Sequence, residues 1–554
     1  MLGSIIANPP LTWNDRTMPS DDAESRREFL GGIFTSAGKV VTRRFTKTGE
    51  ALPEIGPAAD SFLTLMQSPD SVRVFFEDGM ERLDPMRGGI WSGDRATVKN
   101  YLYSDRLRLS LECPEGEPTH IAVRWTGQIV GVRRYLCLGE RSEWRAEDPD
   151  RVMPWYFLAY DGKRTHGYGV AVKANAFCSW SADRSGITLW IEVRNGNRGV
   201  LLGERELELC EVVCREGDPE ESAFDSHREF CRQMSPRPRL AGHPVYGLTD
   251  RYRKPEDQTL EAFLESAKVI SELSPNETNR PFCLLESPHT EARQDEALAT
   301  QLKGIGARAG ATVWPLMALD ATPDTWRLAS NPSLLDPTNP EASEQIGERA
   351  AQLVESGFEL IRCNFPPLDF DAETPWTFQS RSRTNAEVLT HLYQRLRLAA
   401  GSAILYGNGA PSHLAAGVFE IANPLLEPPF RDWESAIRQQ VNAISFLGAH
   451  QGNFYALDLS IAEVHGSAHD RVMADWIRML GESGTTLFSS VDPAGLGVEE
   501  WTLLRDAYGF AALEWPVAEP LDWMNSVCPR KWRLREEKVE FDWSTLDGPN
   551  PITP

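Results

Sequence analysis

The pattern of hydrophobic and polar positions changes character near residue 240. Before that point, short runs rich in β-branched and aromatic residues alternate with turn residues, a rhythm typical of an antiparallel β-sandwich. We therefore predict a β-sandwich domain over residues 51–240. Its clearest predicted strands are Ser71–Phe76, Leu107–Glu112, His120–Trp125, Trp155–Tyr160 and Ile187–Val193.

Beyond Pro244, apolar runs of strand length alternate with amphipathic helices, which is typical of βα units and a parallel sheet. We predict a (β/α)₈ TIM barrel over residues 241–525, with a doubly wound open sheet as the alternative. The predicted strands are Phe282–Leu285, Ala311–Met317, Phe358–Phe365, Ser402–Tyr406, Ile444–Leu447, Phe454–Leu457 and Thr486–Ser489. The helices expected between them include Glu291–Leu302, Pro340–Ser356, Thr384–Ala399, Asp432–Asn442, Asp470–Gly481 and Glu499–Ala507.

The two ends of the chain carry weaker patterns. Residues 1–50 are polar and lack periodicity, so we predict a flexible leader or a decayed signal. The run Ser25–Leu30 resembles a twin-arginine export motif, but the apolar stretch behind it is interrupted by Lys39. Residues 526–554 are expected to form a C-terminal β extension and tail, with a hairpin inside Lys531–Trp543.

Composition excludes several classes of function. No stretch of the 554 residues is long and apolar enough to span a bilayer, which excludes a membrane-spanning role. A net charge of −23 without a basic stripe argues against a nucleic-acid partner. The nine cysteines form no CxxC pair and mostly lie in apolar runs, which favours free core thiols and the cytoplasm over export, and we predict neither a metal nor a cofactor. The oligomeric state stays open.

Candidate chemistry follows from the predicted barrel, because ligand groups project from the carboxyl ends of barrel strands. Polar and aromatic residues at those ends are therefore the candidates. The residues predicted to bind substrate are Glu286, Trp314, Arg362, Asn364, Asn408, His413 and Glu420. Further residues near strand ends are Ser287, Glu427, Asp458 and Asp492.

The domain order, with the run Leu360-Ile361-Arg362-Cys363-Asn364-Phe365 at a strand end, resembles the clan of retaining α-glycosidases that contains α-galactosidases (melibiases) and raffinose synthases. The resemblance covers roughly residues 60–545 and points to an uncharacterised bacterial branch. Stretches that support it are His166–Gly169, Cys178–Trp180, Ile187–Trp190, Leu414–Gly417 and Leu521–Met524. It implies a carbohydrate or glycoside as the partner and two carboxyl groups astride the anomeric carbon.

The sequence departs from that clan at three places. Arg362-Cys363-Asn364 stands where the clan carries Lys-x-Asp, and a neutral amide cannot attack as the nucleophile. Only Glu427 offers a carboxyl group in the segment 423–429, where the acid/base Asp is expected. Leu285-Glu286-Ser287-Pro288 replaces an Asp-Asp-Gly-Trp motif, which we assign to the first barrel strand.

Three functions remain open, and so does the question of whether the chain is an enzyme. The first is a non-hydrolytic, sugar-binding member of the clan, a pseudoenzyme. The second is an active glycosidase or transglycosidase that uses displaced carboxylates, with Asp369, Glu427 and Asp458 as catalytic candidates; inversion needs two such groups about 6.5–9.5 Å apart. The third is a protein-assembly subunit. Each candidate also has a structural explanation, such as a cap for His413 or an ion pair with Arg431 for Glu420.

Overall fold

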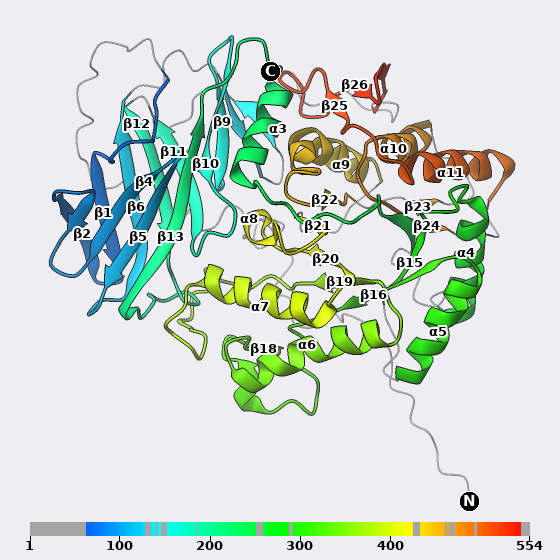
Figure 1. Cartoon of the computed structure of the whole chain (residues 1–554), viewed down its shortest axis with the longest axis horizontal. Coiled ribbons are helices and arrows are strands. Elements are labelled where there is room, and N and C mark those ends of the chain that lie inside the picture. Colours follow the sequence, from blue (N-terminus) through cyan, green and yellow to red (C-terminus); the bar gives the residue numbers. More distant parts are fainter. Residues whose placement is uncertain are drawn as a thin grey trace, which may run out of the picture.

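A computed structural model describes residues 62–127, 134–139, 142–145, 152–183, 185–250, 259–286, 292–424, 433–459, 463–464, 471–491, 493 and 496–543. The predicted leader with its export motif lies outside these residues, as do Ser287, Glu427, Arg431 and Asp492. Figure 1 shows an antiparallel region, coloured blue to green, beside a helix-covered parallel region.

The antiparallel region is one sheet of 13 strands in the order β11-β12-β6-β1-β2-β3-β4-β5-β13-β10-β9-β7-β8. The strands are β1 (Ser71–Phe76), β2 (Gly79–Pro85), β3 (Ile90–Ser92), β4 (Thr97–Tyr103), β5 (Arg106–Cys113), β6 (Pro118–Thr126), β7 (Arg134–Cys137), β8 (Glu143–Arg145), β9 (Tyr156–Tyr160), β10 (Thr165–Val170), β11 (Phe177–Asp183), β12 (Gly186–Glu192) and β13 (Gly203–Arg215).

The sheet folds over at β2. That strand pairs with β1 through Gly79–Leu83 and with β3 through Asp84 and Pro85, so it belongs to both halves. The halves touch through aromatic side chains, since the rings of Phe157 on β9 and Trp180 on β11 are 6.0 Å apart. This arrangement is compatible with the predicted sandwich.

The second region is a TIM-barrel-like parallel sheet in the order β22-β21-β20-β19-β16-β15-β14-β24-β23. A hydrogen bond from the Thr486 amide to the Leu457 carbonyl, 3.1 Å long, links β24 to β22 at the opposite end of this order. The strands are β14 (Tyr246–Thr249), β15 (Phe282–Leu285), β16 (Arg308–Val313), β19 (Leu360–Asn364), β20 (Ile404–Asn408), β21 (Ile421–Asn423), β22 (Ala456–Leu457), β23 (Glu463–Val464) and β24 (Leu487–Val491). A separate apolar cluster that includes Phe282, Leu360, Tyr406 and Phe488 collects side chains from five of these strands and their approaches.

Helices surround the parallel strands (Figure 1). They are α4 (Leu260–Leu273), α5 (Ala292–Gly304), α6 (Pro340–Glu355), α7 (Asn385–Ala400), α8 (Ser412–Ala415), α9 (Trp433–Leu447), α10 (Arg471–Glu482) and α11 (Val498–Ala511), with the short 3₁₀ helices η2 (Asp324–Trp326) and η3 (Gly448–His450). A capping box between Thr384 and Glu387 starts α7, and Asn339 caps α6. In the described part of the chain, no helix is both long and apolar enough to cross a membrane.

Two small β elements complete the fold. A hairpin of β17 (Arg327–Leu328) and β18 (Asn331–Leu335) is inserted after β16. Near the C-terminus, β25 (Glu519–Pro520), β26 (Lys531–Leu534) and β27 (Glu537–Glu540) form a three-stranded sheet. The hairpin predicted within Lys531–Trp543 is therefore confirmed.

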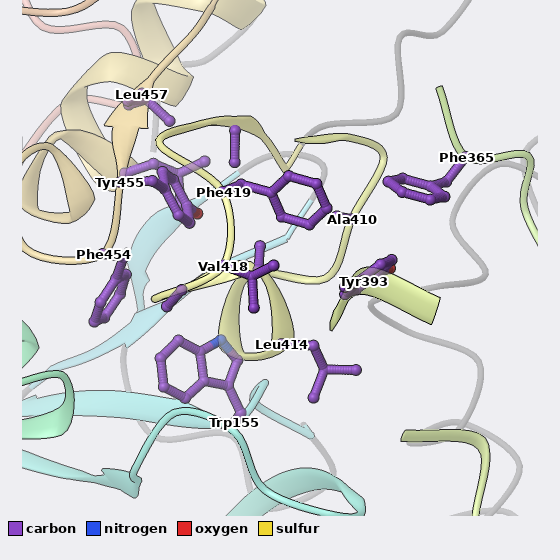
Figure 2. Packing of buried hydrophobic residues seen from close by; sticks show 14 of the residues in the cluster. Trp155, Phe365, Tyr393, Ala410, Leu414, Val418, Phe419, Phe454, Tyr455 and Leu457 are labelled. Carbon is purple, nitrogen blue, oxygen red and sulfur yellow. The ribbon is translucent and has the colours of Figure 1, made fainter. Parts of the chain in front are cut away.

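The helix α3 (Ala223–Met234) lies between the two sheets. Its Phe230 packs on β10, where a Cβ at Gly167 would lie 2.4 Å from the Phe230 ring, so this close approach requires glycine. Figure 2 shows a second part of the junction, where Trp155 lies next to Leu414 and Val418 from the segment that follows β20. One apolar core therefore continues across the junction.

Two predictions about the strands are corrected. Strand β14 precedes Phe282–Leu285 and pairs with β24, so Phe282–Leu285 is the second strand and Asn364 ends the fourth. The predicted strand Ile444–Leu447 is instead the last turn of α9. The buried residues Ile437, Val441 and Ile444 have helical spacing, and a short apolar run does not by itself distinguish a strand from a buried helix.

Candidate functional site

Three neighbouring strands of the parallel sheet end on asparagine. Asn364 on β19 pairs in register with Asn408 on β20, and Asn408 pairs with Asn423 on β21. Backbone hydrogen bonds hold this register, from the Phe365 amide to the Asn408 carbonyl (3.0 Å) and from the Gly409 amide to the Asn423 carbonyl (3.1 Å). Three side-chain amides therefore stand at one level at the carboxyl ends of the strands, which we call the asparagine row.

The amide oxygens of two members of the asparagine row are buried without a donor. Asn364 is only 4% exposed, and its Oδ1 accepts no hydrogen bond from any residue that the structure describes. The same holds for Oδ1 of Asn408. Because burying an acceptor without a partner costs about 1–3 kcal/mol, such atoms in a native protein call for an explanation. A ligand hydroxyl is one donor that would satisfy them.

An ion pair between buried Arg362 and partly buried Glu286 lies before the asparagine row along β19. Arg362, two residues before Asn364 on the same face of β19, donates from Nη1 to Oε1 of Glu286. That oxygen also accepts from the Thr249 hydroxyl (3.1 Å), and Oε2 accepts from the Thr312 hydroxyl (3.2 Å). Both carboxylate oxygens of Glu286 are thus engaged by protein groups.

Asp458 forms the second internal carboxylate site. It follows β22 and is fully buried. Its Oδ2 accepts a hydrogen bond from the Tyr406 hydroxyl, and its Oδ1 accepts one from the Thr486 hydroxyl at 2.9 Å. The Tyr406 ring also lies under the Arg362 guanidinium, 5.0 Å from ring centroid to Cζ, so the two carboxylate sites are neighbours. We call Glu286, Arg362, Tyr406 and Asp458 the internal polar layer.

Trp314 is the aromatic residue that the sequence analysis placed near the site. It directly follows β16 and is 50% exposed, and Met317 and Leu319 on the same segment are 41% and 63% exposed. The Met317 amide donates to the Trp314 carbonyl (3.1 Å), which fixes a turn at this point. An accessible indole face at a strand end suits the apolar face of a pyranose ring.

The loop after β19 carries Asp369 and Asp371, which differ in their surroundings. Asp369 is exposed, and its Oδ1 accepts from the Asp371 amide at 3.1 Å. Asp371 instead pairs with Arg194 of the antiparallel sheet region (3.1 Å). The backbone of the same loop is held by Asn197, whose Nδ2 donates to the Ala372 carbonyl at 2.8 Å. The loop is therefore fixed against the antiparallel region.

His413 does not lie at the asparagine row. It belongs to α8 and is buried between Trp155 and Phe177, with ring centroids 5.6 and 5.8 Å away. Burial lowers the pKa of His413 to about 3, so the imidazole is neutral. Its surroundings are apolar rings from the antiparallel region, which differs from the predicted position at the barrel mouth.

Glu420 also lies away from the carboxyl ends of the strands, where the prediction had placed it. It precedes β21 and lies at the amino end of that strand, whereas Asn423 marks the carboxyl end. Its carboxylate pairs with Arg397 (3.0 Å) and Arg239 and accepts the Leu405 amide. Glu420 is thus an ion-paired residue on the side of the sheet opposite to the asparagine row.

The structure brings together Glu286, Arg362, Asn364, Asn408 and Asp458 among the predicted residues. It adds residues that the sequence did not single out. They are Asn423, the hydrogen-bond partners Tyr406, Thr249, Thr312 and Thr486, and Asp250, which accepts the Glu286 amide at 2.8 Å. A search for the last residue of every short apolar run would have found Asn423, because it closes the run Ile421–Asn423.

Comparison with known proteins gives the fold. No family model and no curated protein sequence matches the chain. Among solved structures, the α-galactosidase of Thermus thermophilus in complex with p-nitrophenyl α-D-galactopyranoside matches with a TM-score of 0.53 and 16% identity, over 82% of this chain and 98% of that one. A doubly substituted variant of the GH36 α-galactosidase AgaA of Geobacillus stearothermophilus in complex with stachyose matches with a TM-score of 0.51 and 12% identity, over 79% of this chain and 75% of that one.

The α-galactosidase of Lactobacillus brevis is similar as well, with a TM-score of 0.52 and 10% identity over 83% of this chain and 77% of that one. At these identities the likeness establishes the fold alone. The predicted resemblance is confirmed at that level: the chain has an α-galactosidase-like glycoside hydrolase fold, with a TIM-barrel-like parallel sheet and a large antiparallel sheet.

Proposed function

We propose that the protein binds a glycoside at the carboxyl ends of its parallel strands and does not hydrolyse it by the retaining mechanism. The observation that carries this proposal is the asparagine row, in which Oδ1 of Asn364 is buried and accepts no hydrogen bond from the described residues. An amide offers both a donor and an acceptor, which matches the hydroxyl groups of a sugar.

Two further observations support a carbohydrate as the ligand. Structures with the same fold have been solved with sugars, namely p-nitrophenyl α-D-galactopyranoside, stachyose and raffinose. The half-exposed Trp314 supplies an aromatic face next to the strand ends. α-Galactosides are therefore the first ligands to test.

The absence of retaining hydrolysis is inferred from chemistry. The retaining mechanism needs a carboxylate nucleophile and a second carboxyl group that transfers the proton. The ends of β19, β20 and β21 present neutral amides, and the carboxylates of Glu286 and Asp458 are hydrogen-bonded within the protein. The alternative is hydrolysis by displaced carboxylates such as Asp369 or Glu427.

Calorimetric titration of the purified chain with raffinose and stachyose tests binding, and release of p-nitrophenol from p-nitrophenyl α-D-galactopyranoside tests hydrolysis. We expect saturable binding without turnover, and binding weakened about 10-fold or more by Asn364→Ala because a buried hydrogen bond is lost. Gln301→Ala, on the exposed surface of α5, is the matched control and should bind as the native chain does. Turnover that disappears in Asp369→Asn or Glu427→Gln would establish the alternative.

A further inference from the structure

A second polar cluster lies where α3, the antiparallel sheet and the parallel region meet. His227 and Cys231 come from α3, and His450 ends η3. The exposed fractions of the three residues are 0%, 0% and 1%. One ring nitrogen from each histidine and the Cys231 sulfur all lie within 4.8 Å of one another. Three nitrogen and sulfur donors thus converge in the core.

Tyr156 of β9 joins the two imidazoles. Its hydroxyl oxygen is 2.8 Å from Nε2 of His227 and 2.6 Å from Nε2 of His450. A phenol has only one proton, so it donates to one ring and accepts from the other. Nδ1 of His227 is buried and has no hydrogen-bond partner in the described part of the chain.

The hydrogen bonds around Tyr156 leave a lone pair for a metal ion. The ring nitrogen that accepts the proton of the Tyr156 hydroxyl carries a lone pair, which is the form of histidine that ligates a metal. The Cys231 thiol would give up its proton when a metal ion binds to its sulfur.

We infer that His227, Cys231 and His450 form a structural zinc site, with the Tyr156 hydroxyl as the nearest fourth donor. Neutral imidazoles and a thiolate are ligands that Zn²⁺ accepts in tetrahedral sites, whereas Mg²⁺ and Ca²⁺ take oxygen ligands. Complete burial fits a structural site, which needs no open position for substrate.

The surroundings of the cluster support fixed ligand positions. The spacing His227-x-x-x-Cys231 places both side chains on one face of α3, since residues four apart are neighbours on a helix. Nδ1 of His450 is 3.3 Å from the Tyr455 hydroxyl, a second-sphere contact that orients the ring. Trp523 stacks on the His227 ring with centroids 6.0 Å apart and planes 2° from parallel.

We expect the zinc ion to stabilise the contact between the antiparallel sheet, α3 and the parallel region. Tyr156, the α3 ligands and His450 are far apart in the sequence and come from the antiparallel sheet, the connecting helix and the parallel region. A metal ion held by them would link these parts in the folded state only, so its binding free energy would add to stability. This inference does not depend on the proposed sugar binding.

Elemental analysis of the full chain, produced with zinc in the medium and purified without chelators, tests the site. We expect about one zinc ion per chain, in the manner of structural sites, and its loss in Cys231→Ala. Cys113→Ala, an equally buried cysteine on β5, is the matched control and should keep the metal.

Cobalt substitution of the native chain provides a readout that does not depend on the folding of a variant. Co²⁺ added to metal-free protein should give the thiolate-to-cobalt absorption and the visible bands of a tetrahedral site, and zinc should abolish both. Zinc should also raise the midpoint of thermal unfolding of the metal-free chain. A native chain that neither contains nor binds zinc, or that binds copper in its place, would overturn the assignment.

Discussion

The internal polar layer and the asparagine row lie next to each other in the parallel sheet, yet they differ in whether their acceptor oxygens receive hydrogen bonds. The carboxylates of Glu286 and Asp458 receive hydrogen bonds from arginine, tyrosine and threonine side chains. The amide oxygens of Asn364 and Asn408 receive none from the described residues. Polar groups that are satisfied within the protein stabilise the fold, whereas unsatisfied ones at strand ends are available to a ligand.

The internal polar layer also bears on why the fold does not imply hydrolysis. A carboxylate that is fixed by a guanidinium and two hydroxyls is poorly placed to attack or to transfer a proton. Function depends on the groups at the site and not on the architecture that carries them.

Breaking the ion pair between Arg362 and Glu286 should have the largest effect. Arg362→Met leaves the carboxylate of Glu286, whose side chain is 15% exposed, without its cation, which should lower the free energy of unfolding by about 3–5 kcal/mol in urea titrations. The control is Glu359→Gln, which breaks the ion pair between Glu359 and Arg308. The Glu359 side chain is 53% exposed, so this variant should lower the free energy of unfolding by less than about 1 kcal/mol. Equal effects of the two variants would contradict the structural role of the internal polar layer.

His413 also carries a buried polar atom without a hydrogen-bond partner in the part of the chain that the structure describes, but we do not expect it to bind a ligand. Its Nε2 has no partner among the described residues, but its pKa of about 3 and its aromatic neighbours indicate a neutral core residue. The pKa of this histidine is about 3 in the folded protein and about 6.5 in the unfolded chain. The neutral imidazole therefore contributes its full stabilisation of the fold above pH 6.5, and this stabilisation is lost as the pH falls toward 3.

Lowering the pH from 7 to 5 should therefore reduce the free energy of unfolding by about 2 kcal/mol through this histidine alone. His413→Phe keeps an aromatic ring against Trp155 and should reduce the pH dependence by that amount in urea titrations at the two pH values. An unchanged pH dependence in this variant would show that the imidazole is protonated or solvated in the native protein.

Tyr406→Phe removes the hydroxyl that donates to Asp458 and keeps the ring beneath Arg362. We expect a loss of about 1–3 kcal/mol in the free energy of unfolding, because a buried acceptor loses its donor. Sugar affinity should stay within about twofold of the native value, since this hydroxyl belongs to the internal polar layer. A large loss of affinity with unchanged stability would place Tyr406 in the ligand site.

In contrast to Tyr406→Phe, Trp314→Ala should weaken sugar binding and have the smallest effect on the free energy of unfolding. The side chain is half exposed, so the free energy of unfolding should change by no more than about 0.5 kcal/mol. Removing the aromatic face should cost about 0.5–1.5 kcal/mol of binding free energy, measured by calorimetry with raffinose. The control is Leu398→Ala, which changes an exposed apolar side chain away from the strand ends. Trp190→Ala is unsuitable as a control because the Trp190 indole donates a hydrogen bond to Ser181.

Much of the fold could be predicted because local patterns match local structure. The predicted strands Ser71–Phe76 and Phe282–Leu285 coincide with β1 and β15, and the helix predicted over Pro340–Ser356 ends one residue from α6. Strand β14 was missed because a glycine interrupts the apolar run of its four residues, whereas all four residues of β15 are apolar. A Cβ at Gly247 would lie 1.8 Å from the Phe282 carbonyl oxygen, so the glycine reflects a contact with β15 that the local pattern does not show.

The candidate site was predicted less completely than the fold. The positions of Asn364 and Asn408 at strand ends could be predicted because they end clear apolar runs. Glu420 precedes a strand of only three residues, and its position at the amino end became clear only from the pairing of β20 with β21. The location of His413 depends on Trp155 and Phe177 of the other sheet, and no local pattern predicts a contact between regions so far apart in the sequence.

The most direct test of the central claim is a crystal structure of the native chain soaked with p-nitrophenyl α-D-galactopyranoside. We predict an intact glycoside whose hydroxyl groups donate to Oδ1 of Asn364 and of Asn408, at the carboxyl ends of β19 and β20. A sugar bound elsewhere, an empty asparagine row, or a glycosyl group covalently attached to a displaced carboxylate would contradict the account.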